Sequence, residues 1–221
     1  MPNTAWENSF VHLYGETAAV SKNISRLRRG RLFRYLKRGD LVLDLFCGKC
    51  ETARGLKRLG FDRVICGDFS VRLLKTAGAG HMMRVRLDAL NVPIKEHSFP
   101  FVIIQGGLHH LQSTGQIIRC LNAIKEIIKP DGIVFISEPS NTVLLALWLF
   151  FINNTLLWKL FAYSRNWHDL HVEEKTTHEN YLKNCGTVHE YIKNNWMILH
   201  YKKGLVTDLF LLKNRAEALK D

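Results

Sequence analysis

The sequence lacks three features, each of which would define a class of protein. It has no internal repeat and no low-complexity tract, which argues against repeat arrays and long disordered linkers. Residues 1–10 show no charged start followed by an apolar stretch, so we expect no secretory signal. The five cysteines are odd in number and lack the spacing of a disulfide framework. These absences favour a reducing compartment, and we expect a cytoplasmic location.

Acidic residues are scarce relative to basic ones. The 221 residues include 31 Lys and Arg but only 20 Asp and Glu, which gives a net charge of +11. Such an excess indicates an acidic partner, which could be nucleic acid, a phosphorylated substrate or an anionic membrane. Eight basic residues and no acid lie between Lys22 and Arg38, among apolar residues. We interpret this segment as a solvated basic helix that packs one apolar edge, with polyanion contact as the alternative.

Apolar segments and helical patterns alternate along most of the chain. With 47% apolar residues, the length suits one sizeable α/β domain. Apolar runs predict strands, and residues 51–60, 71–76 and 113–130 have helical patterns between them. This alternation predicts a parallel sheet with helices on both faces and ligands at the carboxyl ends of its strands. The tail, residues 196–214, reads as two strands joined by Lys-Lys-Gly, an antiparallel hairpin. The expected strands of the parallel part are residues 41–45, 63–68, 82–90, 99–105 and 131–139.

Cys47-Gly48-Lys49-Cys50 has three possible interpretations. A C-x-x-C between a strand and a helix is where a redox pair would lie, but the preceding residues show no strand of the kind that a thioredoxin-like fold requires. A zinc site is the weaker alternative, because no second C-x-x-C completes a set of four ligands. The same residues also form a tight turn between a strand and a helix N-terminus, which is typical of a nucleotide-cofactor site. We favour the cofactor turn, and we expect no metal.

Four motifs follow one another between about residues 38 and 140: "LVLDLFCGKC", "VICGDFSVRLL", "RLDALNVPIKEHSFPFVIIQGGLHHL" and "IKEIIKPDGIVFISEPS". In this order and spacing they resemble the motifs of class I S-adenosylmethionine-dependent methyltransferases, of the type 11-like group that acts on small molecules. The resemblance implies an α/β, Rossmann-like, doubly wound and mostly parallel seven-stranded sheet with a C-terminal antiparallel hairpin, in three αβα layers. It also implies S-adenosylmethionine as the cofactor.

The resemblance assigns candidate cofactor residues. The family's acidic residue that binds both ribose hydroxyls corresponds to Asp68, and the Asp-Ala pair that meets the adenine corresponds to Asp88 and Ala89, with Phe69 as a neighbour that could stack on the ring. A small residue at Gly48 lets the backbone approach the methionine part. The full set implied is Asp44, Phe46, Cys47, Gly48, Cys50, Asp68, Phe69, Asp88, Ala89 and Gln105.

The sequence departs from the family pattern at three positions. The family's first and third glycines of the turn are Phe46 and Cys50 here, and Pro100 replaces an acidic residue before the fourth strand. If the turn needs a positive φ, a non-glycine residue there costs roughly 1 kcal/mol. A degenerate family member that binds a partner without catalysis is therefore the alternative function.

Histidines follow the fourth expected strand. His109 and His110 are candidate general bases, because imidazole titrates near neutral pH and a hydroxyl acceptor must lose a proton. Glu138 and Asn141, after the fifth expected strand, are candidate substrate contacts. The polar stretch around His168 and His171 is expected to be a loop that covers the substrate, with metal binding as a minority interpretation.

Residues 143–163 are apolar on nearly every side of a helix, but two asparagines and a lysine interrupt them. We therefore expect a cover over the active site, a membrane-interface helix or a dimer contact rather than a span. This favours methyl transfer to an oxygen of a small or lipid-like acceptor, with peripheral membrane contact. RNA is a less favoured acceptor, and the chain could be a monomer or a homodimer. We expect a single domain made of a helical cap (1–38), a cofactor core (39–140), a substrate-covering insertion (141–187) and terminal strands (188–221).

Overall fold

The computed structural model describes residues 16–77, 82–154 and 162–214, without the side chains of Glu16, Trp148 and residues 151–173. One seven-stranded sheet runs through the molecule in the order β3-β2-β1-β4-β5-β7-β6. The five strands from β1 to β5 are parallel, whereas β7 pairs antiparallel with both β5 and β6. The predicted fold class is confirmed, including the terminal hairpin. The strands are β1 (Val42–Leu45), β2 (Val64–Asp68), β3 (Met83–Arg86), β4 (Phe99–Gln105), β5 (Ile128–Pro139), β6 (Trp196–Lys202) and β7 (Thr207–Asn214).

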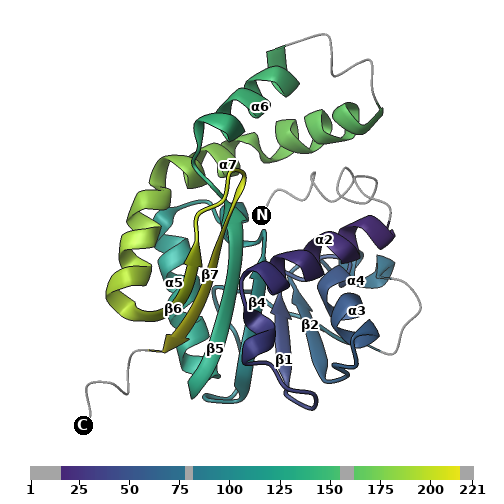
Figure 1. The fold of residues 1–221 in the computed structure, drawn as a ribbon, viewed down its shortest axis with the longest axis vertical. Coiled ribbons are helices and arrows are strands. Elements are labelled where there is room, and N and C mark those ends of the chain that lie inside the picture. The colour runs from purple at the N-terminus through teal and green to yellow at the C-terminus, as the bar shows by residue number, and fades with distance from the viewer. Residues whose placement is uncertain (1–15, 78–81, 155–161, 215–221) are drawn as a thin grey trace.

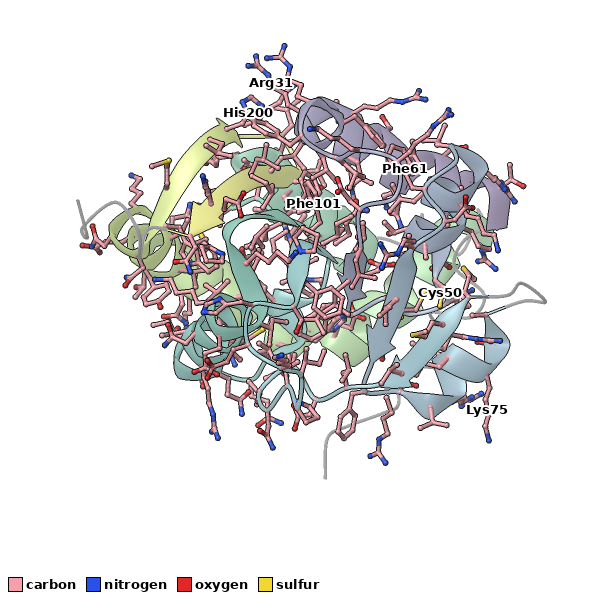
Figure 2. The ribbon with its side chains drawn as sticks, turned by 90° about the horizontal axis from the view of Figure 1, so that it is seen from below. Arg31, Cys50, Phe61, Lys75, Phe101 and His200 are labelled. Carbon is pink, nitrogen blue, oxygen red and sulfur yellow. The ribbon has the colours of Figure 1, made fainter. Side chains whose placement is uncertain are left out.

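Helices cover both faces of this sheet (Figure 1). One apolar core lies between the strands and α5 and α7, and the other lies between the strands and α2, α3 and α4. Figure 2 shows Phe101 at the centre of the molecule and Arg31 and Lys75 at its rim. The helical elements are α2 (Glu16–Arg29), η1 (Leu32–Arg34), α3 (Glu51–Arg58), α4 (Val71–Thr76), η2 (Leu108–His110), α5 (Thr114–Ile127), α6 (Val143–Asn154) and α7 (Ala162–Asn195).

The basic segment forms α2, which buries Ile24 and Leu27 against the second core, as expected of a basic helix with one apolar edge. The expected helix from residue 113 ends earlier than predicted. Ile128 leaves the helical conformation and pairs with Phe99 at the start of β5. Pro130 keeps the helix from continuing, because a proline disfavours helical backbone in the residue before it, which is Lys129.

The substrate loop expected around His168 and His171 is wrong, since residues 162–195 form the single helix α7. Glu174 and His178, four residues apart on this helix, both face η2 at the end of β4. A polar stretch that resembles a loop in sequence is therefore a helix whose polar face packs on the sheet edge. The side chains of His168 and His171 themselves lie outside the described residues.

The helix α6 and the first part of α7 extend beyond the edge at which the parallel strands end (Figure 1). Within the described part of the chain, no helix is both long and apolar enough to cross a membrane.

Candidate active site and cofactor turn

The turn from β1 into α3 has an unusual backbone. Phe46, Gly48 and Cys50 have φ angles of 58°, 54° and 59°, all in the left-handed region. A residue with a side chain pays roughly 1–2 kcal/mol for this conformation. The turn therefore does require positive φ at the two positions where the family has glycine and this chain does not.

The side chain of Phe46 packs into a space left by a glycine at the end of the neighbouring strand β4. A Cβ atom on Gly107 would lie 2.4 Å from the Phe46 ring, which is too close for any residue but glycine. Gly106, just before it, has a φ of 75°. The two glycines that end β4 thus accommodate the phenylalanine of the turn and the backbone bend into η2.

Asp68 at the end of β2 ties this turn in place. Its two carboxylate oxygens accept hydrogen bonds from the backbone N–H groups of Gly48 and Ser70, each at 2.8 Å. The Ser70 hydroxyl in turn caps α4 by accepting from Leu73 N–H. Since a carboxylate has about four lone-pair sites, Asp68 has the capacity to bind further donors.

Three of the implied cofactor residues have buried side chains beneath the turn. Asp44, Cys47 and Cys50 are 1%, 6% and 0% exposed. Burial, followed by the nearby charges of Cys50 and Glu51, raises the pKa of Asp44 well above its ordinary value. Hydrogen bonds from the thiols of Cys47 and Cys66 lower the pKa of Cys50 to about 4. Only the backbone of Cys47 and Cys50 is therefore placed to meet a ligand above the turn.

The implied adenine residues lie beyond β3. Asp88 is exposed and accepts a hydrogen bond from Leu90 N–H at 2.9 Å, whereas Ala89 is buried. Phe69 is 41% exposed, and the guanidinium of Arg86 lies 5.0 Å from its ring centroid. This part of the edge offers an exposed carboxylate and an aromatic ring of the kind that a nucleobase would meet.

Gln105 links β4 to the helices on the other side of the turn. Its Nε2 donates to Thr52 Oγ1 at 3.1 Å, and the same hydroxyl accepts from Asn23 Nδ2 at 3.1 Å. Its Oε1 atom is buried and has no hydrogen-bond partner among the described residues. Sequence analysis did not select Thr52 or Asn23, because nothing in their local pattern shows that α2 reaches α3.

The two histidines lie in a buried acidic environment. His109 Nδ1 is 2.8 Å from Glu138 Oε2, and His109 Nε2 is 3.8 Å from Glu174 Oε2. His110 Nδ1 is 3.7 Å from Glu174 Oε1, and the two imidazole rings lie 4.3 Å apart. Glu138 also accepts from the N–H groups of Gly107 and Leu108 at 2.8 Å, so both its oxygens are engaged. Glu138 is thus buried behind His109.

The two histidines differ in their protonation. Burial alone would lower the pKa of His109, but the hydrogen bonds and charges of Glu138 and Glu174 outweigh it and raise the pKa to about 10. Burial and the adjacent charge of His109 lower the pKa of His110 to about 4. At neutral pH the site therefore contains one imidazolium and, next to it, one neutral imidazole.

One sequence candidate, Asn141, and one residue that sequence analysis did not select, Glu174, remain. Asn141 is exposed, and its Nδ2 donates to the carbonyl of Leu182 at 3.1 Å, so it connects the end of β5 to α7. Glu174 was part of a polar cluster to which sequence analysis gave no individual role. Its position four residues before a histidine on a helix was the available signal, but only the fold brings it to His109.

Comparison with known proteins shows that the chain is similar to methyltransferases. Residues 43–136 match the model of the family described as "Methyltransferase domain". The chain is 29% identical over 116 residues to a demethylmenaquinone methyltransferase of Staphylococcus epidermidis, a match that covers 49% of this chain and 47% of that protein. It is 25% identical over 130 residues to a probable tRNA methyltransferase 9B of Bos taurus, covering 57% and 28%. The chain thus spans about half the length, or less, of these curated relatives.

Among solved structures, the fold is similar to that of the N-methyltransferase NodS from Bradyrhizobium japonicum in complex with S-adenosyl-L-homocysteine. The TM-score is 0.56, the sequence identity is 13%, and the superposition covers 88% of this chain and 86% of the other. At that identity the likeness concerns the fold. The fold agrees with the match of residues 43–136 to the methyltransferase domain family, so the chain is similar in fold to S-adenosylmethionine-dependent methyltransferases.

Proposed function

We propose that the chain is an enzyme that transfers a methyl group from S-adenosylmethionine to an oxygen of a small, lipid-like acceptor. The observation that carries this proposal is the pair of adjacent histidines at the carboxyl end of β4, beside the cofactor turn, with His109 held by Glu138 at 2.8 Å. In sheets of this kind, ligands bind at that edge.

The residues present fit the cofactor. S-adenosylmethionine supplies an electrophilic methyl group on a sulfonium, so the protein mainly has to bind and align. Asp68 would accept from the ribose hydroxyls, Asp88 from the adenine amino group, and Phe69 would stack on the base. The unpartnered Oε1 of Gln105 would accept from an ammonium group. The N-terminus of α3 would direct N–H donors at the carboxylate of the methionine part, because the single N–H of Gly48 already donates to Asp68.

The two histidines would have different roles. His110 is neutral near pH 7 and partly exposed, so it can take the proton that an acceptor hydroxyl loses. His109 keeps its proton because Glu138 and Glu174 hold it, and its positive charge would favour the negative charge that develops on the acceptor oxygen. Glu138 acts through His109 and is a positioning residue.

The lipid-like character of the acceptor is supported by α6. Val143, Leu147 and Phe150 on this helix are 78%, 50% and 59% exposed, next to the end of β5. Exposed apolar side chains on one helix near a site are typical of contact with an apolar ligand or a membrane surface. We accordingly include peripheral membrane contact in the proposal.

A second candidate is a non-catalytic binding protein of the same fold. The specific observation in its favour is the positive φ at Phe46 and Cys50, which places side chains in the turn where the family has glycine. This candidate predicts weak or no cofactor binding and no methyl transfer.

Calorimetric titration with S-adenosylmethionine and S-adenosylhomocysteine tests the proposal. We expect micromolar binding by the wild-type chain and at least hundredfold weaker binding by Asp68→Ala. Asp62→Ala is the matched control, because Asp62 is an exposed aspartate that precedes β2, at the opposite edge of the sheet. His110→Ala should bind S-adenosylhomocysteine as the wild type does but transfer methyl groups 10²–10⁴-fold more slowly to a quinol or phenol acceptor. An absence of binding at millimolar ligand would overturn the enzyme proposal and favour the binding protein.

A further inference from the structure

Three cysteines from two parts of the chain converge beneath the cofactor turn. Cys47 and Cys50 belong to the turn, and Cys66 lies on β2. Their Sγ atoms all lie within 4.8 Å of one another, and those of Cys47 and Cys50 are 3.9 Å apart. All three are free thiols with buried side chains. We call this set the thiol triad, and methyl transfer as proposed above makes no use of it.

The spacing of the triad suits a tetrahedral metal ion. Zinc binds thiolate sulfur at about 2.3 Å, so two sulfurs on one tetrahedral zinc are about 3.8 Å apart. The measured 3.9 Å between Cys47 and Cys50 is close to this value. A C-x-x-C on a tight turn supplies two ligands of many zinc sites, and Cys66 adds the third from the neighbouring strand.

Asp44 is the nearest candidate for a fourth ligand. It is the register partner of Cys66 across β1 and β2, so the two side chains are on the same face of the sheet. It does not belong to the group whose ligand atoms all lie within 4.8 Å of one another, so its side chain would have to shift towards the thiols when an ion binds. Its Oδ2 atom is buried and has no hydrogen-bond partner among the described residues, and zinc accepts carboxylate oxygen as a ligand.

The surrounding charge would balance such an ion. Three thiolates and one carboxylate carry four negative charges, so a divalent ion would leave two. Arg54 and Arg84 both act on Cys50 electrostatically from nearby, and they supply two positive charges. The closed pocket therefore has a charge balance that favours a buried, fully protein-ligated metal over an open, catalytic one.

We propose that Cys47, Cys50 and Cys66, with Asp44 as the fourth ligand, bind one structural divalent ion of the zinc class. The ion joins the cofactor turn to β2 and holds Cys50 in its left-handed conformation, which stabilises a turn that lacks two glycines. Binding displaces the thiol protons of the ligand cysteines, and no electrons are transferred. The sequence argued against zinc because only one C-x-x-C is present, but the third thiol lies 16 residues further along and is brought in by the parallel pairing of β1 and β2.

Elemental analysis of the full chain, purified without chelator, tests this inference independently of cofactor binding. We expect about one zinc per chain in the wild type and in Cys120→Ser, and less than about 0.1 in Cys66→Ser. Cys120 is the matched control because it is equally buried but lies on α5, in the core on the other face of the sheet.

A second measurement covers the case in which Cys66→Ser does not fold. The wild-type chain is stripped with a chelator and loaded with cobalt(II), which should give the near-ultraviolet charge-transfer band of thiolate ligands and lose it again when zinc is added. The inference would be overturned if the chain contains no zinc and gives no cobalt band. It would also be overturned if the mass of the purified chain is lower by two hydrogens and the difference maps to a disulfide between Cys47 and Cys50. Zinc binding without S-adenosylmethionine binding would support the metal site and reject the proposed enzyme, so the two proposals fail separately.

Discussion

At the scale of single residues, Phe46 and Gly107 fit each other. The ring of Phe46 fills the space in which a Cβ of residue 107 would lie, at 2.4 Å. We therefore expect Gly107→Ala to lower the free energy of unfolding by about 1–3 kcal/mol, the usual cost of overpacking. Chemical denaturation monitored by circular dichroism measures this.

Gly186→Ala is the matched control for that change. Residue 186 lies inside α7 and a Cβ there would meet nothing within 4 Å, so alanine should raise the free energy of unfolding by up to about 1 kcal/mol. In a Phe46→Gly background, which removes both the ring and the Cβ atom that would lie 2.6 Å from a Cβ at position 107, the cost of Gly107→Ala should largely disappear. An equal cost in both backgrounds would show that the ring is not what requires glycine at position 107.

The ion pair at His109 makes stability depend on pH. The groups that face it are Glu138, Glu174, His110, His178 and Tyr181. The pKa of His109 is raised from 6.5 to about 10, so its contribution is fully present below pH 6.5 and is lost as the pH rises towards 10. The pKa of Glu138 is lowered from 4.5, so its contribution is lost as the pH falls below that value. The pair of His109 and Glu138 should therefore stabilise most between about pH 4.5 and 6.5, whereas the lowered pKa of His110 opposes folding as the pH falls below 6.5.

We expect His109→Gln to lose about 3 kcal/mol of unfolding free energy near pH 6, because it leaves two buried carboxylates without their cation. The loss should shrink steadily between pH 7 and pH 10. His200→Gln, at the rim of the molecule (Figure 2), is the control and should show no such shrinkage. A pH-independent difference between wild type and His109→Gln would mean that the imidazole contributes by packing and not by charge.

At the scale of elements, the local sequence pattern predicted the structure correctly where a single residue sets the start or the end of a helix. Ser70 caps α4 and Gly60 ends α3 with a positive φ, as their sequence positions predict. Pattern failed at α7, where a helix 34 residues long carries polar side chains on the face that packs against η2. Because charged residues replace apolar ones on this packed face, the sequence lacks the apolar stripe by which an amphipathic helix is predicted.

The candidate site likewise has residues that the sequence predicts and residues that only the fold brings in. Asp68 and the turn were predicted from an ordered set of motifs, since these residues are neighbours along a strand and its loop. Glu174 and Cys66 were not given roles, because each meets its partners only through the pairing of strands or the packing of α7. Sequence identifies candidate ligand-binding residues at strand ends, but it does not show which distant side chains lie beside them.

At the scale of the whole molecule, positive charge and exposed apolar surface occur together. The chain has a net charge of +11, and α6, which carries exposed apolar side chains, extends beyond the edge of the sheet at which the proposed site lies (Figure 1). Basic residues near an anionic bilayer contribute about 1 kcal/mol each, and apolar side chains add to this when they enter the interface. If the acceptor is lipid-like, we expect the protein to bind vesicles that contain anionic lipid more strongly than neutral ones.

Cosedimentation with vesicles of neutral lipid, with and without about 30% anionic lipid, measures this binding. Leu147→Gln combined with Phe150→Gln should weaken it at least about tenfold, which corresponds to 1.4 kcal/mol. Met83→Gln is the control, because Met83 is 62% exposed but lies on the edge strand β3, at the opposite side of the sheet from α6. Salt at about 1 M, where the Debye length is about 3 Å, should remove the preference for anionic lipid but leave the effect of the α6 substitutions. If the α6 variant binds as the wild type does while salt abolishes all binding, the charge alone is responsible. In that case α6 would not be a membrane contact, and its apolar residues would be free to meet the acceptor itself.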